Sequence, residues 1–305
     1  MNGKLYILGA PPCIFSGLAP ELQQRMEYVD NFLHFPKEKW KQLTHALLVG
    51  RLPLPRPILY TWFSRKGLDH LLQATAADRV LLYEGTNWRT LRAIKSLLPA
   101  ATRCFIYYCN PIRSIFRRPE QELAAIARLG YRLSTFDPED AARYGLTLTG
   151  QYFRYPEGPL PEEKTDCFFC GLPKDRAEEL EQLRRLLESN GWQCRFIIPQ
   201  RNEQRISYAD YLLQLATSRC VIDICQKDQV GLTRRPLEAL FYGKKLITNN
   251  PKIQEYDFYN SKNIFIFGKN STDGLNDFLR QPIEPVPTNV KDKYDINGWI
   301  RHYLP

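Results

Sequence analysis

No window of this 305-residue sequence approaches the roughly 20 consecutive apolar residues that a membrane-spanning helix requires. Low-complexity tracts, short internal repeats and a signal-peptide pattern are also missing. With 44% hydrophobic and 25% charged residues, the composition is ordinary for a globular protein and excludes a disordered or collagen-like chain. We expect a cytoplasmic protein with two domains, since a domain commonly holds about 100 to 200 residues.

Patterns that bind metal are scarce. The four histidines have no ligand spacing, and the sequence contains no Asp-x-Asp motif. Cys167 and Cys170 have zinc-knuckle spacing, but the two phenylalanines between them continue a strand where a knuckle needs a turn. Most of the eight cysteines lie in apolar runs, where a thiol behaves as a small buried hydrophobe. We expect no metal and no cofactor.

The positive charge is concentrated in the first half of the chain. Residues 1–155 hold 21 basic and 12 acidic residues, whereas residues 156–305 hold 21 of each. The net charge of +9 therefore belongs wholly to the first half. We expect this half to meet an anionic partner, such as a phosphorylated or carboxylated acceptor, an acidic membrane surface or nucleic acid. The alternative is a basic surface that only keeps the protein soluble.

Apolar runs alternate with amphipathic segments along the chain. In the second half we expect strands at 166–170, 194–198, 220–224, 245–248 and 263–267, and helices at 174–190, 208–217 and 235–242. In the first half we expect strands at 5–8, 58–62, 80–83, 104–108 and 132–135, and helices at 21–32, 68–76, 90–98 and 120–129. Strands separated by helices favour parallel crossovers, so the fold class is α/β with two Rossmann-like parallel-sheet domains.

Proline-rich segments mark the expected domain boundaries. One such segment near residue 156 separates an N-terminal domain, 1–155, from a C-terminal domain, 156–285. A second follows residue 281, and the remaining residues 286–305 are expected to contain a helix that crosses back toward the N-terminal domain.

The densest chemistry follows the third expected strand of the second half. Gly231 and Thr233 precede a helix start, Arg234 and Arg235 add positive charge, and Glu238 lies about one turn inside the helix. Backbone N–H groups at a helix start bind anions. A carboxylate one turn later can accept hydrogen bonds from vicinal ribose hydroxyls. Phosphate and ribose together indicate a nucleotide.

The block Gly-Leu-Thr-x-x-Pro-x-Glu-Ala-Leu-x-x-Gly-Lys-Lys-Leu-Ile-Thr resembles the nucleotide-sugar-binding element of bacterial GT-B-fold glycosyltransferases of lipopolysaccharide and capsule assembly. The resemblance covers about residues 164–268 and rests elsewhere on general architecture. It implies two Rossmann-like domains with a cleft between them, and transfer of a sugar from a nucleotide diphosphate to an anionic glycan or lipid-linked saccharide. It also implies that Glu238 holds the donor ribose, while Gly231, Leu232 and Thr233 hold the diphosphate.

The same resemblance suggests the rest of the donor site. The expected donor-binding residues are Gly171, Lys174, Arg176, Arg201, Ile206, Gly231, Leu232, Thr233, Arg234, Arg235 and Glu238. The family usually places a basic residue just after the first strand of this domain, where Lys174 and Arg176 lie, and the loop 199–207 would read the base. Because an Asp-x-Asp motif is missing, these cations, with Arg234, Arg235 and the helix dipole, would neutralise the leaving diphosphate. We therefore expect transfer without a metal.

In the first half, Glu84 follows an apolar strand and precedes a helix, where a general base would deprotonate an acceptor hydroxyl. The alternative is a carboxylate that stabilises the start of that helix, and a retaining transferase would need no protein base. Asn110 follows the next strand, while Arg65 and Lys66 follow the strand expected at 58–62. These three are the candidate acceptor-binding residues.

Residues 34–43 mix aromatic side chains with lysines, as do surfaces that dock on anionic lipid headgroups. An ordinary solvated helix is the alternative. Peripheral attachment to the inner face of the cytoplasmic membrane would suit a lipid-linked acceptor.

Two other functions remain open. A nucleotide-sugar 2-epimerase has a similar two-lobed fold but needs no acceptor surface, so the basic first half argues against it. A non-enzymatic nucleic-acid-binding protein would explain the charge. However, no recognisable recognition motif is present, and Glu238 would repel a phosphate backbone. We expect no nucleic-acid partner.

Overall fold

The computed structural model describes residues 3–10, 12–29, 38–52, 54–84, 86–199, 204–226 and 231–305. The chain divides into two compact units. Unit 1 comprises Met1–Gly150 together with Ile296–Pro305, and unit 2 comprises Gln151–Asp295. The C-terminal residues therefore pack with the first unit.

Unit 1 is built on a parallel sheet with strand order β2-β1-β3-β4-β5-β6. Its strands are β1 (Leu5–Leu8), β2 (Met26–Val29), β3 (Arg79–Tyr83), β4 (Arg103–Tyr108), β5 (Tyr131–Thr135) and β6 (Thr147–Leu148). Its helices are η1 (Pro12–Phe15), α1 (Pro20–Gln23), α2 (Lys39–Leu48), α3 (Arg56–Leu59), α4 (Arg65–Leu71), α5 (Trp88–Leu97), α6 (Ile112–Ile115), α7 (Pro119–Arg128), α8 (Pro138–Tyr144) and α14 (Ile296–Ile300).

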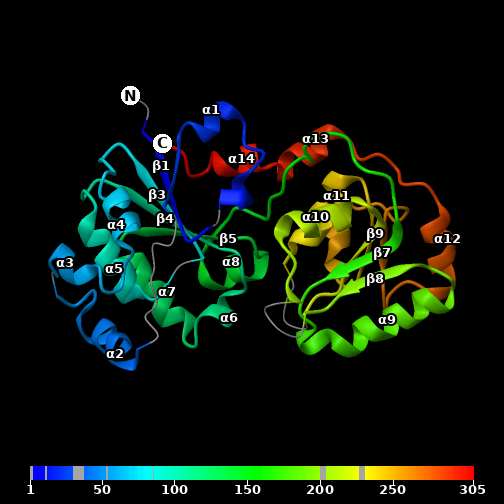
Figure 1. Cartoon of the computed structure of the whole chain (residues 1–305), viewed down its shortest axis with the longest axis horizontal. Coiled ribbons are helices and arrows are strands. Elements are labelled where there is room, and N and C mark those ends of the chain that lie inside the picture. The colour runs from blue at the N-terminus through cyan, green and yellow to red at the C-terminus, as the bar shows by residue number, and fades with distance from the viewer. Residues whose placement is uncertain are drawn as a thin grey trace. The chain divides into compact units, whose positions relative to one another are not determined.

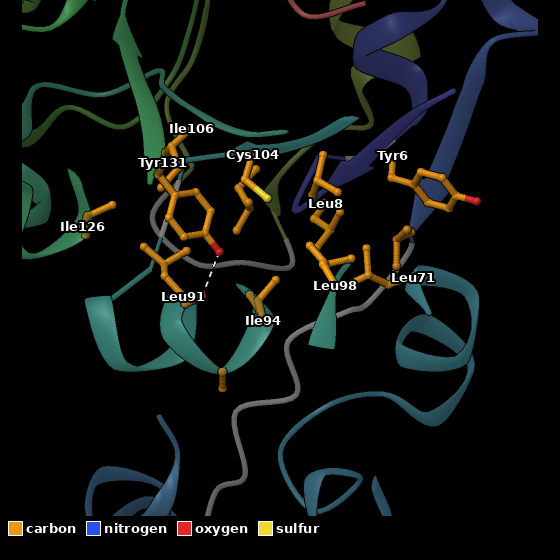
Figure 2. Packing of buried hydrophobic residues seen from close by; sticks show 14 of the residues in the cluster. Tyr6, Leu8, Leu71, Leu91, Ile94, Leu98, Cys104, Ile106, Ile126 and Tyr131 are labelled. Carbon is orange, nitrogen blue, oxygen red and sulfur yellow. Dashed lines mark hydrogen bonds between the residues drawn. The ribbon is translucent and has the colours of Figure 1, made fainter. Parts of the chain in front are cut away.

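Strands β1, β3 and β4 consist of buried apolar residues, apart from Arg79 and Arg103 at the starts of β3 and β4, because both faces of the sheet are covered. On one face, Leu91 and Ile94 of α5 pack with Cys104 and Ile106 of β4 (Figure 2). The hydroxyl of Tyr131 in β5 reaches into this layer and donates a hydrogen bond to the carbonyl oxygen of Leu91 at 2.8 Å. The bond satisfies a polar group that burial would otherwise penalise.

Unit 2 holds a second parallel sheet, with order β11-β10-β9-β7-β8. Its strands are β7 (Thr165–Cys170), β8 (Cys194–Ile197), β9 (Ser218–Asp223), β10 (Lys245–Thr248) and β11 (Ile264–Ile266). Its helices are η2 (Lys174–Arg176), α9 (Ala177–Ser189), α10 (Tyr208–Ala216), α11 (Arg234–Tyr242), η4 (Pro251–Glu255), η5 (Thr272–Gly274), α12 (Leu275–Arg280), α13 (Thr288–Lys291) and η6 (Asp292–Tyr294). Helices α10 and α11 cover one face, and α9 and α12 the other (Figure 1). Two Rossmann-like parallel-sheet units are thus confirmed.

In both sheets the strand order reverses at the first strand, so that the second and third strands lie on opposite sides of it. In unit 1 the chain runs from β1 to β2 on one side and then to β3 on the other, and in unit 2 it runs from β7 to β8 and then to β9. Open α/β sheets bind ligands beyond the carboxyl ends of strands at such a switch point. Gly9 and Glu84 follow β1 and β3, and Gly171 and Ile224 follow β7 and β9. A ligand-binding site is therefore expected at these strand ends.

Two expected elements are wrong. The helix expected at 21–32 is the short helix α1 followed by β2, because Met26 to Val29 pair in parallel with β1 and complete the edge of the sheet. The strand expected at 58–62 is a helix, α3, that ends at Leu59. Pro57 lies in its first turn, where the missing N–H has no helical partner.

The expected terminal helix is broken into η6 and α14. Trp299 of α14 packs edge-on against Tyr107 of β4, with 4.8 Å between the ring centroids. The hydroxyls of Tyr303 and Ser134 share a hydrogen bond of 2.8 Å. These contacts attach the C-terminal residues to the sheet of unit 1. Over the described ranges, no helix is both long and apolar enough to cross a bilayer.

Candidate functional site

Two arginines join the carboxyl ends of β7 and β9 at the switch point of unit 2. Arg235, in the first turn of α11, donates to Asp223 Oδ1 at 3.2 Å and to the carbonyl oxygen of Cys170 at 2.8 Å. Arg176, at the end of η2, donates to the carbonyl oxygen of Ile224. Both guanidiniums lie at the strand ends predicted to bind a ligand. Their hydrogen bonds connect the end of β7 with the end of β9.

Asp223 is the anchor of this arrangement. It is only 1% exposed, and its second carboxylate oxygen accepts a hydrogen bond from the Thr233 hydroxyl at 2.8 Å. Thr233 occupies the N-cap position of α11 but makes no side-chain cap bond. The Thr233 hydroxyl therefore bonds to Asp223 and not to the backbone of α11. The backbone N–H groups at the start of α11 are the groups in this loop that would bind an anion.

The charges of the two arginines respond to these surroundings. Burial, followed by the neighbouring Arg235, lowers the pKa of Arg176. Burial alone would lower the pKa of Arg235, but Asp223 and the neighbouring Tyr211 and Glu238 outweigh it, so that pKa is raised. Both side chains are cationic at neutral pH, because an arginine pKa lies far above 7. The Arg235 charge is compensated by its ion pair with Asp223, and the Arg176 charge lies beside the same strand ends.

Glu238 lies one turn inside α11 and is only 2% exposed. The Tyr211 hydroxyl, from α10, donates to Glu238 Oε2, and Oε1 has no hydrogen-bond partner among the described residues. Burial raises the pKa of Glu238 and outweighs the opposing effects of this bond and of Arg234 and Arg235. Burial and the nearby Glu238 also raise the pKa of Tyr208 to about 12. One carboxylate oxygen remains able to accept a ligand hydroxyl.

Gly171 is required by close packing. A Cβ at this position would lie 2.7 Å from Arg235 Nη2 and 3.4 Å from Arg176 Nη2. Lys174, three residues later, has a φ of +46°, a backbone conformation that residues other than glycine rarely adopt. Its side chain is exposed and has no partner among the described residues. Lys174 therefore offers an uncommitted positive charge beside the strand end.

The other predicted donor-binding residues that the structure describes lie in the loops before α11 and α10. Gly231 and Leu232 are buried in the loop before α11, and Ile206 is half-buried directly before Ser207, which caps α10. Arg201, expected in the base-reading loop, lies outside the described residues.

In unit 1 the structure brings Glu84 and Asn110 together. Asn110 Nδ2 donates a hydrogen bond to Glu84 Oε1 across the ends of the adjacent strands β3 and β4. Glu84 has a φ of +58°, which strains a residue that carries a side chain. Helix α5 is capped instead by Asn87, whose side chain accepts from the Thr90 N–H at 3.1 Å. The cap contact therefore belongs to Asn87, whereas the Glu84 carboxylate accepts a hydrogen bond from Asn110.

Arg65 and Lys66 do not follow a strand end, because the strand that suggested them is absent. They begin α4, whose N-terminus is capped by Ser64. The Arg65 guanidinium lies 4.9 Å from the centroid of the Tyr60 ring. Among the described residues no hydrogen bond or ion pair links either side chain to the Glu84–Asn110 pair.

The sequence analysis did not select two residues that shape the predicted donor site. Asp223 directly follows the buried apolar residues 220–222 of β9. A carboxylate buried there needs a partner, so its position was a usable signal. Tyr211 lies on the amphipathic helix α10, and nothing in that pattern indicates its contact with Glu238.

A metal would need a cluster of ligating side chains. In the described parts of the chain, no group of three or more His, Cys, Asp or Glu is arranged to hold one. Cys167 and Cys170 both belong to β7, and both are free thiols. Transfer without a metal stays a prediction.

No protein-family model matches this sequence, and comparison with curated proteins gives no match either.

Proposed function

We propose that this protein is a metal-independent glycosyltransferase of the GT-B type, with unit 2 as its donor domain and unit 1 as its acceptor domain. It would move a sugar from a nucleoside diphosphate to an anionic glycan or a lipid-linked saccharide. The observation that carries the proposal is the position of Glu238. A buried carboxylate with one unpaired oxygen lies beside several cations at the switch point of a parallel sheet.

The donor would occupy the carboxyl ends of β7 and β9. Glu238 Oε1 would accept a hydrogen bond from a ribose hydroxyl while Tyr211 holds the other oxygen in place. Lys174, the start of α11 and the Arg234 side chain would bind the diphosphate. Arg176 and Arg235 would act mainly by fixing the strand ends and by adding to the positive potential, since the terminal nitrogens of both guanidiniums already donate to Asp223 or to carbonyl oxygens.

In the transfer step, the bond between the anomeric carbon and the diphosphate oxygen breaks. A bond from the acceptor oxygen to that carbon forms. The departing diphosphate gains negative charge, which the cations stabilise more strongly than they stabilise the bound donor. If the anomeric configuration inverts, the acceptor proton passes to Glu84, with Asn110 orienting its carboxylate. If it is retained, Glu84 would only orient the acceptor.

The acceptor domain would also attach the enzyme to an anionic membrane surface. Of the aromatic and basic residues 34–43, those from Lys39 onward belong to α2. Trp40 and Leu43 of this helix are each 61% exposed, and Leu47 follows on the same face. An apolar stripe flanked by Lys39 and Lys41 is typical of helices that lie in the lipid interface.

The proposal is tested by calorimetric titration with UDP, dTDP, GDP, ADP and CMP in EDTA. We expect selective binding of one nucleotide, weakened by Glu238→Ala and by Arg234→Ala but not by Lys269→Ala, an exposed lysine elsewhere in unit 2. Failure of every nucleotide to bind, or equal binding by all variants, would remove the central support for a transferase.

A further inference from the structure

A cavity in unit 2 lies on the side of α11 opposite to Glu238. Its volume is about 280 Å³. One wall is formed by Pro236, Ala239 and Leu240 of α11 and by Gly243, which follows the helix. Ala239 and Leu240 lie three and four residues after Pro236 and so share a face of the helix with it. The remaining walls come from strands β10 and β11, from Phe258, and from the segment that precedes α13. Glu238 and Arg235 are not among its lining residues, so the cavity is separate from the donor site.

Most of the surface of this cavity is apolar. The apolar lining residues are Pro236, Ala239, Leu240, Leu246, Phe258, Ile264, Ile283, Pro285 and Val286. A ligand inside would therefore be held mainly by its own apolar surface, at about 25 cal/mol for each Å² removed from water.

The polar side chains in the lining are already paired, with one exception. Asn263 donates to the carbonyl oxygen of Glu284 and accepts from its N–H, both at 2.8 Å. The Glu284 carboxylate forms an ion pair with Lys262. Lys244 Nζ lies 3.2 Å from a carboxylate oxygen of Glu163. These groups have little capacity left to bind the hydroxyls of a sugar or the edge of a base.

The exception is Lys291, at the end of α13. Its side chain is half-buried, and its ammonium has no hydrogen bond or ion pair among the described residues. Burial lowers the pKa of Lys291, which indicates that water is partly excluded from the charge. A partly desolvated cation without a counter-ion costs free energy, and an anionic ligand would recover part of that cost.

We propose that this cavity binds a small amphipathic anion, with a compact apolar body and one carboxylate that pairs with Lys291. The volume lies just below the about 300 to 1,000 Å³ usual for ligand pockets, which favours one ring with a short chain over a nucleotide or an oligosaccharide. The single unpaired cation selects a single negative charge. Because the ligand would lie against α11, it would contact the helix that also carries the donor-site residues.

The test compares two probes of similar shape by calorimetric titration of the full chain. The probes are 4-phenylbutyrate, which carries a carboxylate, and 4-phenylbutanol, which is neutral. Charge-assisted hydrogen bonds are among the stronger polar contacts, so we expect the carboxylate to bind about tenfold more tightly than the alcohol. Lys291→Met should abolish that preference and leave binding of the alcohol unchanged. Lys269→Met, which removes an exposed lysine outside the cavity, should leave the preference intact.

A second variant tests the location. Val286→Trp would fill the cavity from a half-buried position and should weaken both probes without lowering the thermal midpoint of unfolding. Equal binding of the two probes by the unmodified protein would overturn the proposal. So would failure of both to bind, or a preference for the carboxylate that survives Lys291→Met. None of these outcomes depends on nucleotide binding.

Discussion

The hydroxyl of Tyr211 donates a hydrogen bond to the buried carboxylate of Glu238 and so connects α10 to α11. The bond fixes one oxygen of the carboxylate and leaves the other without a partner among the described residues. A carboxylate oriented in this way can receive a ribose hydroxyl without first reorganising, which reduces the entropic cost of binding. The following predictions test this arrangement and the groups around it.

The stability of the protein should depend on pH through Glu238. Burial raises the pKa of this carboxyl above its ordinary value of 4.5. The folded state therefore holds the proton more readily than the unfolded state, and folding stability falls as pH rises from 4.5 through the raised pKa. We expect the stability of the unmodified protein relative to Glu238→Gln to decrease over that interval, as measured by urea unfolding at several pH values. A relative stability that increases with pH would mean that this pKa is lowered instead.

Gly171→Ala should disturb the two arginines at the strand ends. The new Cβ would lie 2.7 Å from Arg235 Nη2, and that guanidinium is held by Asp223 and cannot move away freely. We expect a loss of about 1 to 2 kcal/mol in the free energy of unfolding, together with weaker nucleotide binding. The matched control is Gly274→Ala, where no atom lies within 4 Å of the added Cβ. Equal effects of the two substitutions would contradict the packing described.

Glu84→Gln should slow sugar transfer by about 100-fold or more if Glu84 is the general base. Nucleotide affinity should not change, because the donor site belongs to the other unit. Glu84→Gly should also abolish transfer, but it should stabilise the protein by about 1 kcal/mol, since glycine adopts a φ of +58° without strain. Transfer rates and urea unfolding measure the two effects. Unchanged transfer by Glu84→Gln would exclude the general-base role.

Substituting both Trp40 and Leu43 with alanine should weaken binding to vesicles that contain phosphatidylglycerol. Burial of a large apolar side chain contributes about 1.5 to 3 kcal/mol, so a loss of at least about tenfold is expected in a sedimentation assay. Leu213→Ala, at a residue of unit 2 that is 53% exposed, is the control and should have no effect. Failure of the unmodified protein to sediment with anionic vesicles would show that α2 is an ordinary solvated helix.

The sequence predicted the buried strands of both sheets well, because a strand covered on both faces is apolar throughout. Residues 80–83 and 104–108 are examples. It did not predict β2, which is four residues long, includes Glu27, and forms only because it pairs with the distant β1. It also misassigned α3. Prolines usually mark a break in a helix, but Pro57 lies in the first turn, where proline is compatible with a helix.

The site shows the same division between local and distant information. Arg235 and Glu238 belong to one helix start, so a local motif was enough to select them. The contacts that position them come from Asp223 at a strand end and from Tyr211 on another helix. Such pairs are set by tertiary packing. Asp223 and Tyr211 both contact α11 but lie outside the local motif that selected Arg235 and Glu238.

The central claim is that Glu238 binds the ribose of a nucleoside diphosphate. The most direct measurement compares, by calorimetry in EDTA, the nucleoside diphosphate that binds best with its 2′,3′-dideoxy analogue. Hydrogen bonds to a charged group contribute about 1.5 to 3 kcal/mol, so the unmodified protein should bind the analogue at least about tenfold more weakly. Glu238→Gln should largely remove that difference, while Glu162→Gln, at an exposed carboxylate, should preserve it. Equal affinity of the unmodified protein for the two ligands would contradict the claim.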